Sequence, residues 1–185
     1  MPQAVVHCRR AADVQAAIDT AGRAGLPLSV RGGGHDWAGR ALCDGLVLDL
    51  GDMRDVIISP DRRSALVGGG ARTADLLVAT DRLGLVAATG SCSGVGMAGL
   101  TLWGGYGTLI GRFGLALDNL IAADVVLADG SAVTADALRE REMFWALCEL
   151  RDMTANGSRH RLFIVLKAKA RAIPRARAVG ACVLH

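Results

Sequence analysis

Hydrophobic residues in the first fifty positions follow a strand, helix, strand pattern. Residues 4–7 and 28–30 are short runs rich in β-branched side chains, and residues 46–50 read as a further strand. Between the first two runs, residues 11–25 carry apolar side chains at helical spacing: Val14, Ala17, Ile18 and Ala21. Gly25 and Pro27 end that helix. The pattern predicts a β-α-β opening that leads the backbone into a glycine-rich loop.

The remaining pattern predicts a second, mixed lobe. Strands are predicted over residues 56–58, 65–67, 85–88, 120–127 and 132–134, the last two joined by a hairpin turn at 128–131. Helices are predicted over residues 73–83, with Thr73 as cap, and over residues 136–147. We expect an α+β fold with lobes at 1–58 and 59–147, followed by a basic, poorly specified tail over 148–185.

Composition allows one sizeable core or two small lobes, because 51% of the 185 residues are hydrophobic. The 24 glycines and the low aromatic content of 4% favour glycine-lined ligand loops over a base-stacking surface. Net charge is +3, but the tail from Cys148 holds eight Lys or Arg against two Asp or Glu. The preceding 147 residues, with 13 basic and 16 acidic side chains, are therefore slightly acidic.

The five cysteines and four histidines form no recognisable disulfide or zinc pattern. The cysteine number is odd, no pair has CxxC spacing and the histidines are scattered. The N-terminus lacks a charged segment before a long apolar run, and the late apolar stretch at 162–166 is too short to span a bilayer. We expect a cytoplasmic protein with no metal site and no membrane partner.

The first glycine-rich loop, Arg31-Gly32-Gly33-Gly34-His35, directly follows a predicted strand. Consecutive glycines let successive N–H groups face one concavity, because no Cβ restricts φ or blocks a ligand. Such a cradle suits an anion such as pyrophosphate; Arg31 would add positive charge and His35 an imidazole beside the anchored molecule. Spacing alone leaves open a tight surface turn with an incidental histidine.

The second glycine-rich region contains Gly94-Val95-Gly96-Met97-Ala98-Gly99, which matches G-x-G-x-x-G. One interpretation is a Rossmann-type nicotinamide-binding protein, with Asp118 at about the right distance for a ribose contact. That fingerprint must directly follow a strand, however, whereas residues 89–93 intervene here. The Rossmann interpretation is therefore the weaker alternative.

Three segments taken together resemble the berberine-bridge-enzyme-like flavoproteins: VRGGGHDWAG at 30–39, the glycine-rich stretch at 95–107 and RFGLALDNL at 112–120. The resemblance runs in order from about residue 4 to residue 147. It implies the two-lobed FAD-binding domain of the vanillyl-alcohol-oxidase (PCMH) type, with the flavin between the lobes. The family reaction is oxidation of an alcohol, sugar or amine carbon by hydride transfer to covalently bound FAD, with O₂ as acceptor.

The resemblance also implies roles for individual residues. His35 would bond to the 8α carbon of the flavin, a reasonable reaction for a nucleophilic imidazole held next to it. Cys92 stands where doubly tethered members carry a cysteine that attacks flavin C6; an inert, small hydrophobic cysteine is the alternative. The other positions implied to contact FAD are Arg31, Gly32, Gly33, Gly34, Gly39, Val95, Gly96, Gly99, Gly104, Gly105, Gly107 and Val125. For these glycines, turn geometry alone is the alternative.

The sequence departs from the family in two places. Trp103 stands where a third glycine usually precedes Gly104, and an indole there would block the flavin or displace the loop if φ > 0 is needed. After Leu147 the family continues into a substrate domain, whereas here an Arg- and Ala-rich tail follows, as a truncated or frameshifted gene would produce. A genuine compact variant with its own C-terminal extension is the alternative. The substrate and the catalytic base therefore stay unknown, and nothing selects a base among Asp36, Asp55 and Glu142.

Two further functions are alternatives. The chain could be a non-catalytic flavin-binding remnant, with exposed apolar surface that favours self-association. Nucleic-acid binding would use the basic residues of the tail, which are Arg159, Arg161, Lys167, Lys169, Arg171, Arg175 and Arg177. Because no aromatic residues alternate with them, we expect no nucleic-acid partner.

Overall fold

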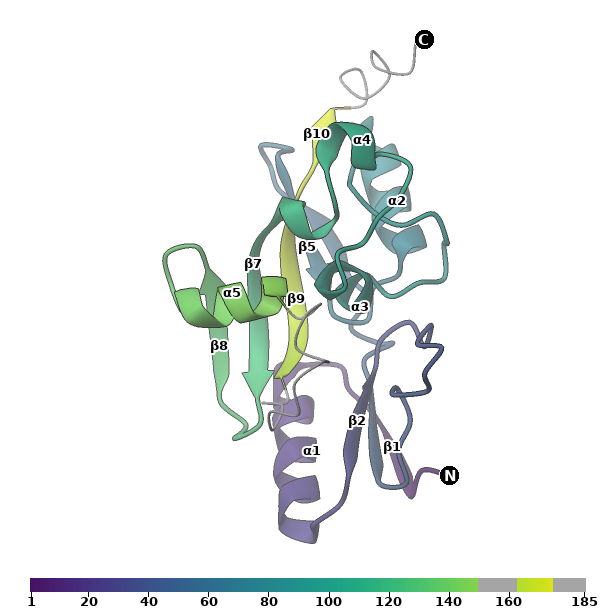
Figure 1. Cartoon of the computed structure of the whole chain (residues 1–185), viewed down its shortest axis with the longest axis vertical. Helices are drawn as coiled ribbons and strands as arrows, with labels where there is room; N and C mark the ends of the chain where they lie inside the picture. The colour runs from purple at the N-terminus through teal and green to yellow at the C-terminus, as the bar shows by residue number, and fades with distance from the viewer. Residues whose placement is uncertain (150–162, 175–185) are drawn as a thin grey trace.

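The computed structural model describes residues 1–149 and 163–174. It shows two lobes stacked along the long axis of the molecule (Figure 1). Helix α1 (Ala11–Ala24) lies in the lobe at the N-terminal end, and α2 (Thr73–Asp81) lies far from it in the other lobe. Within the described residues, no helix is both long and apolar enough to cross a membrane.

The first lobe is a three-stranded parallel sheet with α1 on one face. Its strands are β1 (Ala4–His7), β2 (Leu28–Arg31) and β3 (Leu46–Asp49), in the order β1-β3-β2. The apolar stripe of α1, including Val14 and Ile18, packs against Leu48 of the central strand. The predicted β-α-β opening is confirmed. Because the strands are parallel, Arg31 and Asp49 reach the same edge of the sheet, where β2 leads into the first glycine-rich loop.

The second lobe is a five-stranded antiparallel sheet in the order β4-β5-β9-β7-β8. Its strands are β4 (Val56–Ile58), β5 (Ser64–Gly68), β7 (Leu120–Leu127), β8 (Ala132–Asp136) and β9 (Phe163–Arg171). The predicted hairpin from β7 to β8 is present and turns at Gly130. The assignment of β4 to the first lobe is corrected, because the turn from Ser59 to Ser64 folds β4 back onto β5.

Strand β9 lies at the centre of this sheet, between β5 and β7 (Figure 1). It pairs with both neighbours in antiparallel register. Residues 163–174 therefore belong to the second lobe, which corrects their assignment to a poorly specified tail. The sequence does carry a sign of this strand, which is the alternation of apolar and basic residues from Ala168 to Arg171. In the structure Ala168 and Ala170 are half-buried, whereas Lys169 and Arg171 are exposed. Of the basic residues in the predicted nucleic-acid surface, Arg159, Arg161, Arg175 and Arg177 lie outside the described residues.

Short helices and strands complete the second lobe. They are β6 (Leu85–Val86), α3 (Met97–Leu102), α4 (Ile110–Phe113), the 3₁₀ helix η1 (Leu117–Asn119), α5 (Arg141–Glu149) and β10 (Ile173–Pro174), which pairs with β6. Thr73 does not cap α2. Arg72 precedes the helix and donates its backbone N–H to Asp75, while Thr73 is fully buried. The predicted helix at 136–147 begins only at Arg141, because Asp136 ends β8.

Candidate functional site

Two glycine-rich segments, one from each lobe, touch through their backbones. Gly33 follows β2, and Gly96 is the residue before α3. A Cβ atom on Gly33 would overlap the amide nitrogen of Gly96, and a Cβ on Gly96 would overlap the amide nitrogen of Gly33. Because only glycine permits this approach, each segment fixes the position of the other.

A cavity of about 670 Å³, here called the loop cavity, opens between these segments. Its size lies within the range of small-molecule sites in proteins. Figure 1 shows the segment after β2 below α3, where the two lobes meet. The predicted positions that line the cavity are Gly32, Gly33, Gly34, His35, Val95, Gly96 and Gly99. The structure therefore brings together the two loops that the sequence singled out, although they are some sixty positions apart in the chain.

The imidazole of His35 lies against the second glycine-rich segment. A Cβ on Gly94 would lie 3.1 Å from Nε2 of His35, so a larger residue at position 94 would crowd the ring. His35 is exposed, and the preceding Gly34 has a φ of 71°. That left-handed conformation strains any residue with a Cβ. The two glycines thus allow the imidazole to stand at the wall of the loop cavity.

The guanidinium of Arg31 is paired within the first lobe and does not line the loop cavity. Its Nη1 donates to Oδ2 of Asp49 at 2.8 Å, and the Asp49 side chain is only 10% exposed. This pair offsets the positive charge that Arg31 was expected to offer a phosphate. Backbone N–H groups of the glycine turn are therefore the main anion donors that this segment can offer.

Six predicted positions lie outside the lining of the loop cavity besides Arg31. Cys92 is exposed, two residues before the Gly94 that contacts His35. Gly105 packs against Ala116, and a Cβ on Gly107 would overlap the carbonyl oxygen of Thr89. Val125 is fully buried in the core of the second lobe. Gly39 and Gly104 adopt positive φ in turns. Turn geometry and close packing account for the conformations of Gly39, Gly104, Gly105 and Gly107, and the predicted contact of these glycines with flavin stays a prediction.

Several cavity residues were not among the predicted flavin contacts, although Trp103 was considered as an obstruction and Asp36 as a base. The side chains of Asp36, Arg40 and Trp103 line the loop cavity, as do Trp37 and Leu100. The side chain of Arg40 donates to Asp36, with Nη2 3.1 Å from Oδ1, and this hydrogen bond lowers the pKa of Asp36. The signal was the closeness in sequence of Asp36, Trp37 and Arg40 to His35.

Trp103 is compatible with the backbone at its position. Its φ is −96° and its ψ is 24°, so the conformation needs no glycine. The guanidinium of Arg40 lies 5.1 Å from the centre of the indole ring, within the range of a cation–π contact. The loop is therefore not forced aside by strain at Trp103, and the indole forms part of the cavity wall.

The Rossmann interpretation does not fit the observed geometry. The G-x-G-x-x-G match begins in the long loop after the two-residue strand β6, and its last three residues are the start of the six-residue helix α3. The carboxylate of Asp118 accepts the N–H of Leu115 at 2.9 Å and is used locally. Within the described residues, the motif therefore lacks the parallel βαβ unit that a nicotinamide site needs, because β6 pairs with β10 in antiparallel register, and Asp118 is not free to bind a ribose.

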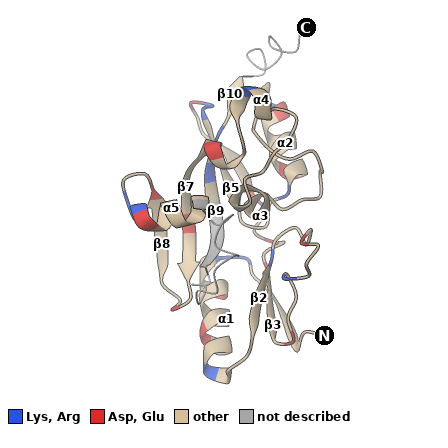
Figure 2. Cartoon of the chain, in the orientation of Figure 1, with Lys and Arg blue, Asp and Glu red and all other residues tan. Residues whose placement is uncertain are grey.

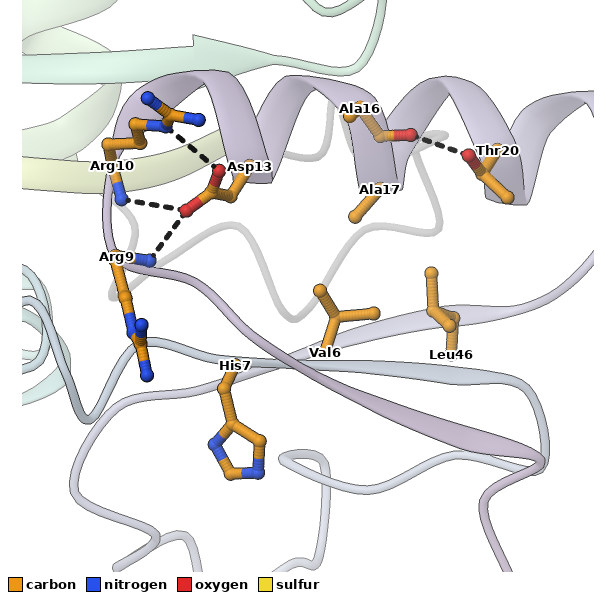
Figure 3. A pocket seen from close by; sticks show the side chains of 9 residues that line it. All are labelled: Val6, His7, Arg9, Arg10, Asp13, Ala16, Ala17, Thr20 and Leu46. Atoms are coloured by element: carbon orange, nitrogen blue, oxygen red, sulfur yellow. Dashed lines mark hydrogen bonds and ion pairs between the residues drawn. The ribbon is translucent and has the colours of Figure 1, made fainter.

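A second cavity, of about 780 Å³, lies between α1 and β1 (Figure 3). The polar groups that line it already form hydrogen bonds at the start of α1, where the carboxylate of Asp13 accepts hydrogen bonds from the backbone N–H groups of Arg9 and Arg10. Hydrogen bonding from the Arg9 N–H and from Arg10 lowers the pKa of Asp13. In Figure 3, the imidazole of His7 points away from α1. Although this cavity is larger, its charged groups already have partners, so we place the functional site at the loop cavity.

Charge does not single out either cavity. Figure 2 shows acidic and basic positions scattered over both lobes. In the part of the chain that the structure describes, no three His, Cys, Asp or Glu side chains gather to hold a metal ion. The chemistry of the loop cavity therefore rests on glycine backbones, His35 and the groups around Trp103.

Comparisons with known proteins point to one family. A family model described as FAD binding domain matches residues 2–136. The FAD-linked oxidoreductase hasG of Aspergillus fumigatus is 37% identical over 180 residues, which is 94% of this chain and 36% of that protein. Berberine bridge enzyme-like 9 of Arabidopsis thaliana is 34% identical over 154 residues, 79% of this chain and 28% of that protein.

A solved structure shows the same fold. The glucooligosaccharide oxidase of Acremonium strictum, described with a 6-S-cysteinyl, 8α-N1-histidyl FAD, has a TM-score of 0.81 at 31% identity over 93% of this chain and 35% of that chain. The chain spans about a third of the length of these relatives. The match to the Aspergillus protein covers more than the first 147 residues, so the likeness continues into the region expected to be an unrelated tail.

The predicted fold and family are thus confirmed together. The two-lobed α+β architecture agrees with the solved relative, and the glycine turns and the cavity wall with His35 fit a flavin nucleotide. The chain belongs to the FAD binding domain family of FAD-linked oxidoreductases, among berberine-bridge-enzyme-like relatives, and FAD is the cofactor of that family's domain.

Proposed function

We propose that this chain holds FAD in the loop cavity and bonds it covalently through His35, as the flavin-holding part of an oxidoreductase. The observation that carries the proposal is the contact between Gly33 and Gly96, which sets His35 at the wall of a cavity between two glycine-rich segments. Backbone N–H groups of residues 32–34 would hold the pyrophosphate. When bound, the flavin would accept a hydride from a substrate carbon and be reoxidised by O₂.

Cys92 is the proposed second attachment point. It is exposed and lies two residues before Gly94, whose backbone lies against the His35 ring. The solved relative from Acremonium strictum carries both a cysteinyl and a histidyl bond to its FAD. A cysteine this close in sequence to the His35 contact supports the same arrangement here.

The proposed substrate class is an alcohol, sugar or amine, as in the family reaction. The glucooligosaccharide oxidase among the relatives supports a carbohydrate alcohol. Asp36 is a poor candidate for the base, because its hydrogen bond with Arg40 lowers its pKa and so weakens its affinity for a proton. Flavin that binds but is reduced by no alcohol, sugar or amine would instead indicate the non-catalytic flavin-binding alternative.

The decisive experiment is to precipitate the purified protein with acid and to record flavin absorbance and peptide mass in the pellet. Yellow colour should stay with the pellet of the wild-type protein and be lost from the double variant His35→Ala, Cys92→Ala. His7→Ala is the matched control, because His7 is an exposed histidine on β1 that does not line the loop cavity. Wild-type protein that folds but retains no flavin after incubation with FAD would refute the proposal.

We also propose self-association and a cytoplasmic location. Large apolar side chains are exposed on the second lobe, among them Leu138 at 89% and Trp145 at 61%. The odd cysteine number, without CxxC spacing, supports a reducing compartment. Comparing the sedimentation of the wild-type protein with that of a Leu138→Ser, Trp145→Ser variant would test self-association. The wild type should sediment faster if this surface associates.

A further inference from the structure

The side chain of Trp103 occupies a distinctive place in the loop cavity. It stands at the C-terminal end of α3, in the second lobe, and its side chain contributes to the cavity that His35 also lines. Trp103 remains 48% exposed. A half-exposed indole in a small-molecule cavity offers a large, flat apolar surface that water covers at a free-energy cost.

Arg40 holds this indole in place from the first lobe. Its guanidinium lies 5.1 Å from the centre of the ring, and two of its nitrogens donate to Asp36, with Nη2–Oδ1 and Nε–Oδ2 separations of 3.1 and 3.4 Å. Arg40 is thus fixed at its charged end and covers one side of the indole. Nearly half of the Trp103 surface nevertheless stays exposed, so Arg40 leaves part of the indole open to a ligand.

We propose that Trp103 is a cofactor-contacting residue whose free face stacks on the planar ring of the flavin, with Arg40 as the positioning residue that orients the indole. This inference rests on the proposed function, because it needs the flavin ring to lie in the cavity that His35 lines. Aromatic rings stack favourably, and an indole that is already held in one orientation loses little freedom on binding. The tryptophan is then a binding determinant, and the alternative is that the indole obstructs the cavity.

The two interpretations predict opposite signs for one substitution. In a His35→Ala, Cys92→Ala background, where binding is reversible, Trp103→Ala should weaken FAD binding about tenfold. Riboflavin, which carries the ring without the pyrophosphate, should lose affinity by the same factor. ADP, which carries the adenine and pyrophosphate without the flavin ring, should bind unchanged. Trp145→Ala, an exposed tryptophan on α5 away from the cavity, is the matched control.

A spectroscopic measurement separates contact from a merely structural role. With Trp37 and Trp145 replaced by Phe, the emission of Trp103 should be quenched on FAD addition, and a long-wavelength charge-transfer absorbance should appear. Arg40→Gln should keep the fold but broaden the Trp103 emission and weaken FAD and riboflavin together. Arg40→Lys keeps the positive charge, so its affinities for FAD and riboflavin should lie between those of the wild type and of Arg40→Gln.

Each result decides for or against the inference. Tighter FAD binding by Trp103→Ala would show that the indole obstructs the cavity, and the proposed function would stand while the inference fails. Equal loss of ADP and riboflavin affinity would assign Trp103 a structural role and likewise overturn the inference. If neither the wild-type chain nor Trp103→Ala binds FAD, the proposed function fails and the inference fails with it.

Discussion

At the scale of single residues, the site depends on positions where a side chain would not fit. Gly33 and Gly96 are the clearest case, because each leaves no space for a Cβ beside the amide nitrogen of the other. Gly70 is a second case, since a Cβ there would overlap the carbonyl oxygen of Leu50, and it joins the segment after β5 to the segment after β3. At these positions the choice of glycine is set by the approach of another backbone, which local sequence spacing cannot reveal.

The Gly33 and Gly96 contact can be tested directly. Gly33→Ala and Gly96→Ala should each reduce the free energy of unfolding by about 1–3 kcal/mol, because the added methyl forces the segments apart. Both should also lose retained flavin. Gly22→Ala is the control: its Cβ has nothing within 4 Å in helix α1, so it should stabilise the fold by roughly 0.5–1 kcal/mol. Urea unfolding curves give these values, and wild-type stability in Gly33→Ala would contradict the close contact.

Thiol reactivity should separate Cys8 from Cys92. Cys8 is fully buried, and burial together with the nearby carboxylates of Asp13 and Asp49 raises its pKa to about 11. A raised pKa leaves only on the order of 0.1% thiolate at pH 8. In the folded protein, Cys92 should therefore react with a thiol reagent at once and Cys8 only on unfolding. Peptide mapping after a short exposure measures both; rapid modification of Cys8 at pH 8 would show that the first lobe opens readily.

At the scale of secondary-structure elements, the sequence predicted those elements whose formation depends on residues close together in the chain. The β-α-β opening, helix α2 and the β7–β8 hairpin follow from residue spacing and turn residues. The partners of β9 did not follow, because β9 pairs with β5 and β7, which are distant from it in the sequence. The pairing of β4 with β5 is a short hairpin, and the lobe boundary predicted after residue 58 separated its two strands. Similarly, the glycine-rich loops were found from their motifs. The pairing of Arg40 with Trp103 was not, because it joins side chains from two lobes that no spacing relates.

The central position of β9 leads to a matched pair of substitutions. Ala168 packs against the core of the second lobe, whereas the adjacent Lys169 is exposed. Ala168→Glu should destabilise the protein by roughly 1–3 kcal/mol, because it places a carboxylate against the apolar core at a half-buried position. Lys169→Glu should change stability by no more than about 0.5 kcal/mol. Denaturant unfolding followed by circular dichroism measures both, and equal effects of the two substitutions would mean that β9 does not present Ala168 to the core.

At the scale of the whole molecule, the loop cavity lies between two lobes that also meet beside α1. One hydrophobic cluster is centred on α1 and its sheet and includes Val126 of β7, and two others lie within the second lobe. The first glycine-rich segment belongs to the first lobe and the second belongs to the other. A ligand held by both segments therefore adds contacts that link the lobes. Its binding free energy should increase the free energy of unfolding of both lobes.

Amide hydrogen exchange with and without FAD tests this arrangement and the choice between the two cavities. In the His35→Ala, Cys92→Ala background, where binding is reversible, saturation at a hundredfold excess over Kd should slow exchange by up to about a hundredfold in residues 32–34 and 94–99, because opening either segment would first release the ligand. Residues 9–17, which border the larger cavity beside α1, should exchange at unchanged rates, since the polar groups there already have partners. Protection confined to residues 9–17 would move the site to the larger cavity. Protection of residues 32–34 alone would mean that FAD rests on the first lobe without bridging to the second.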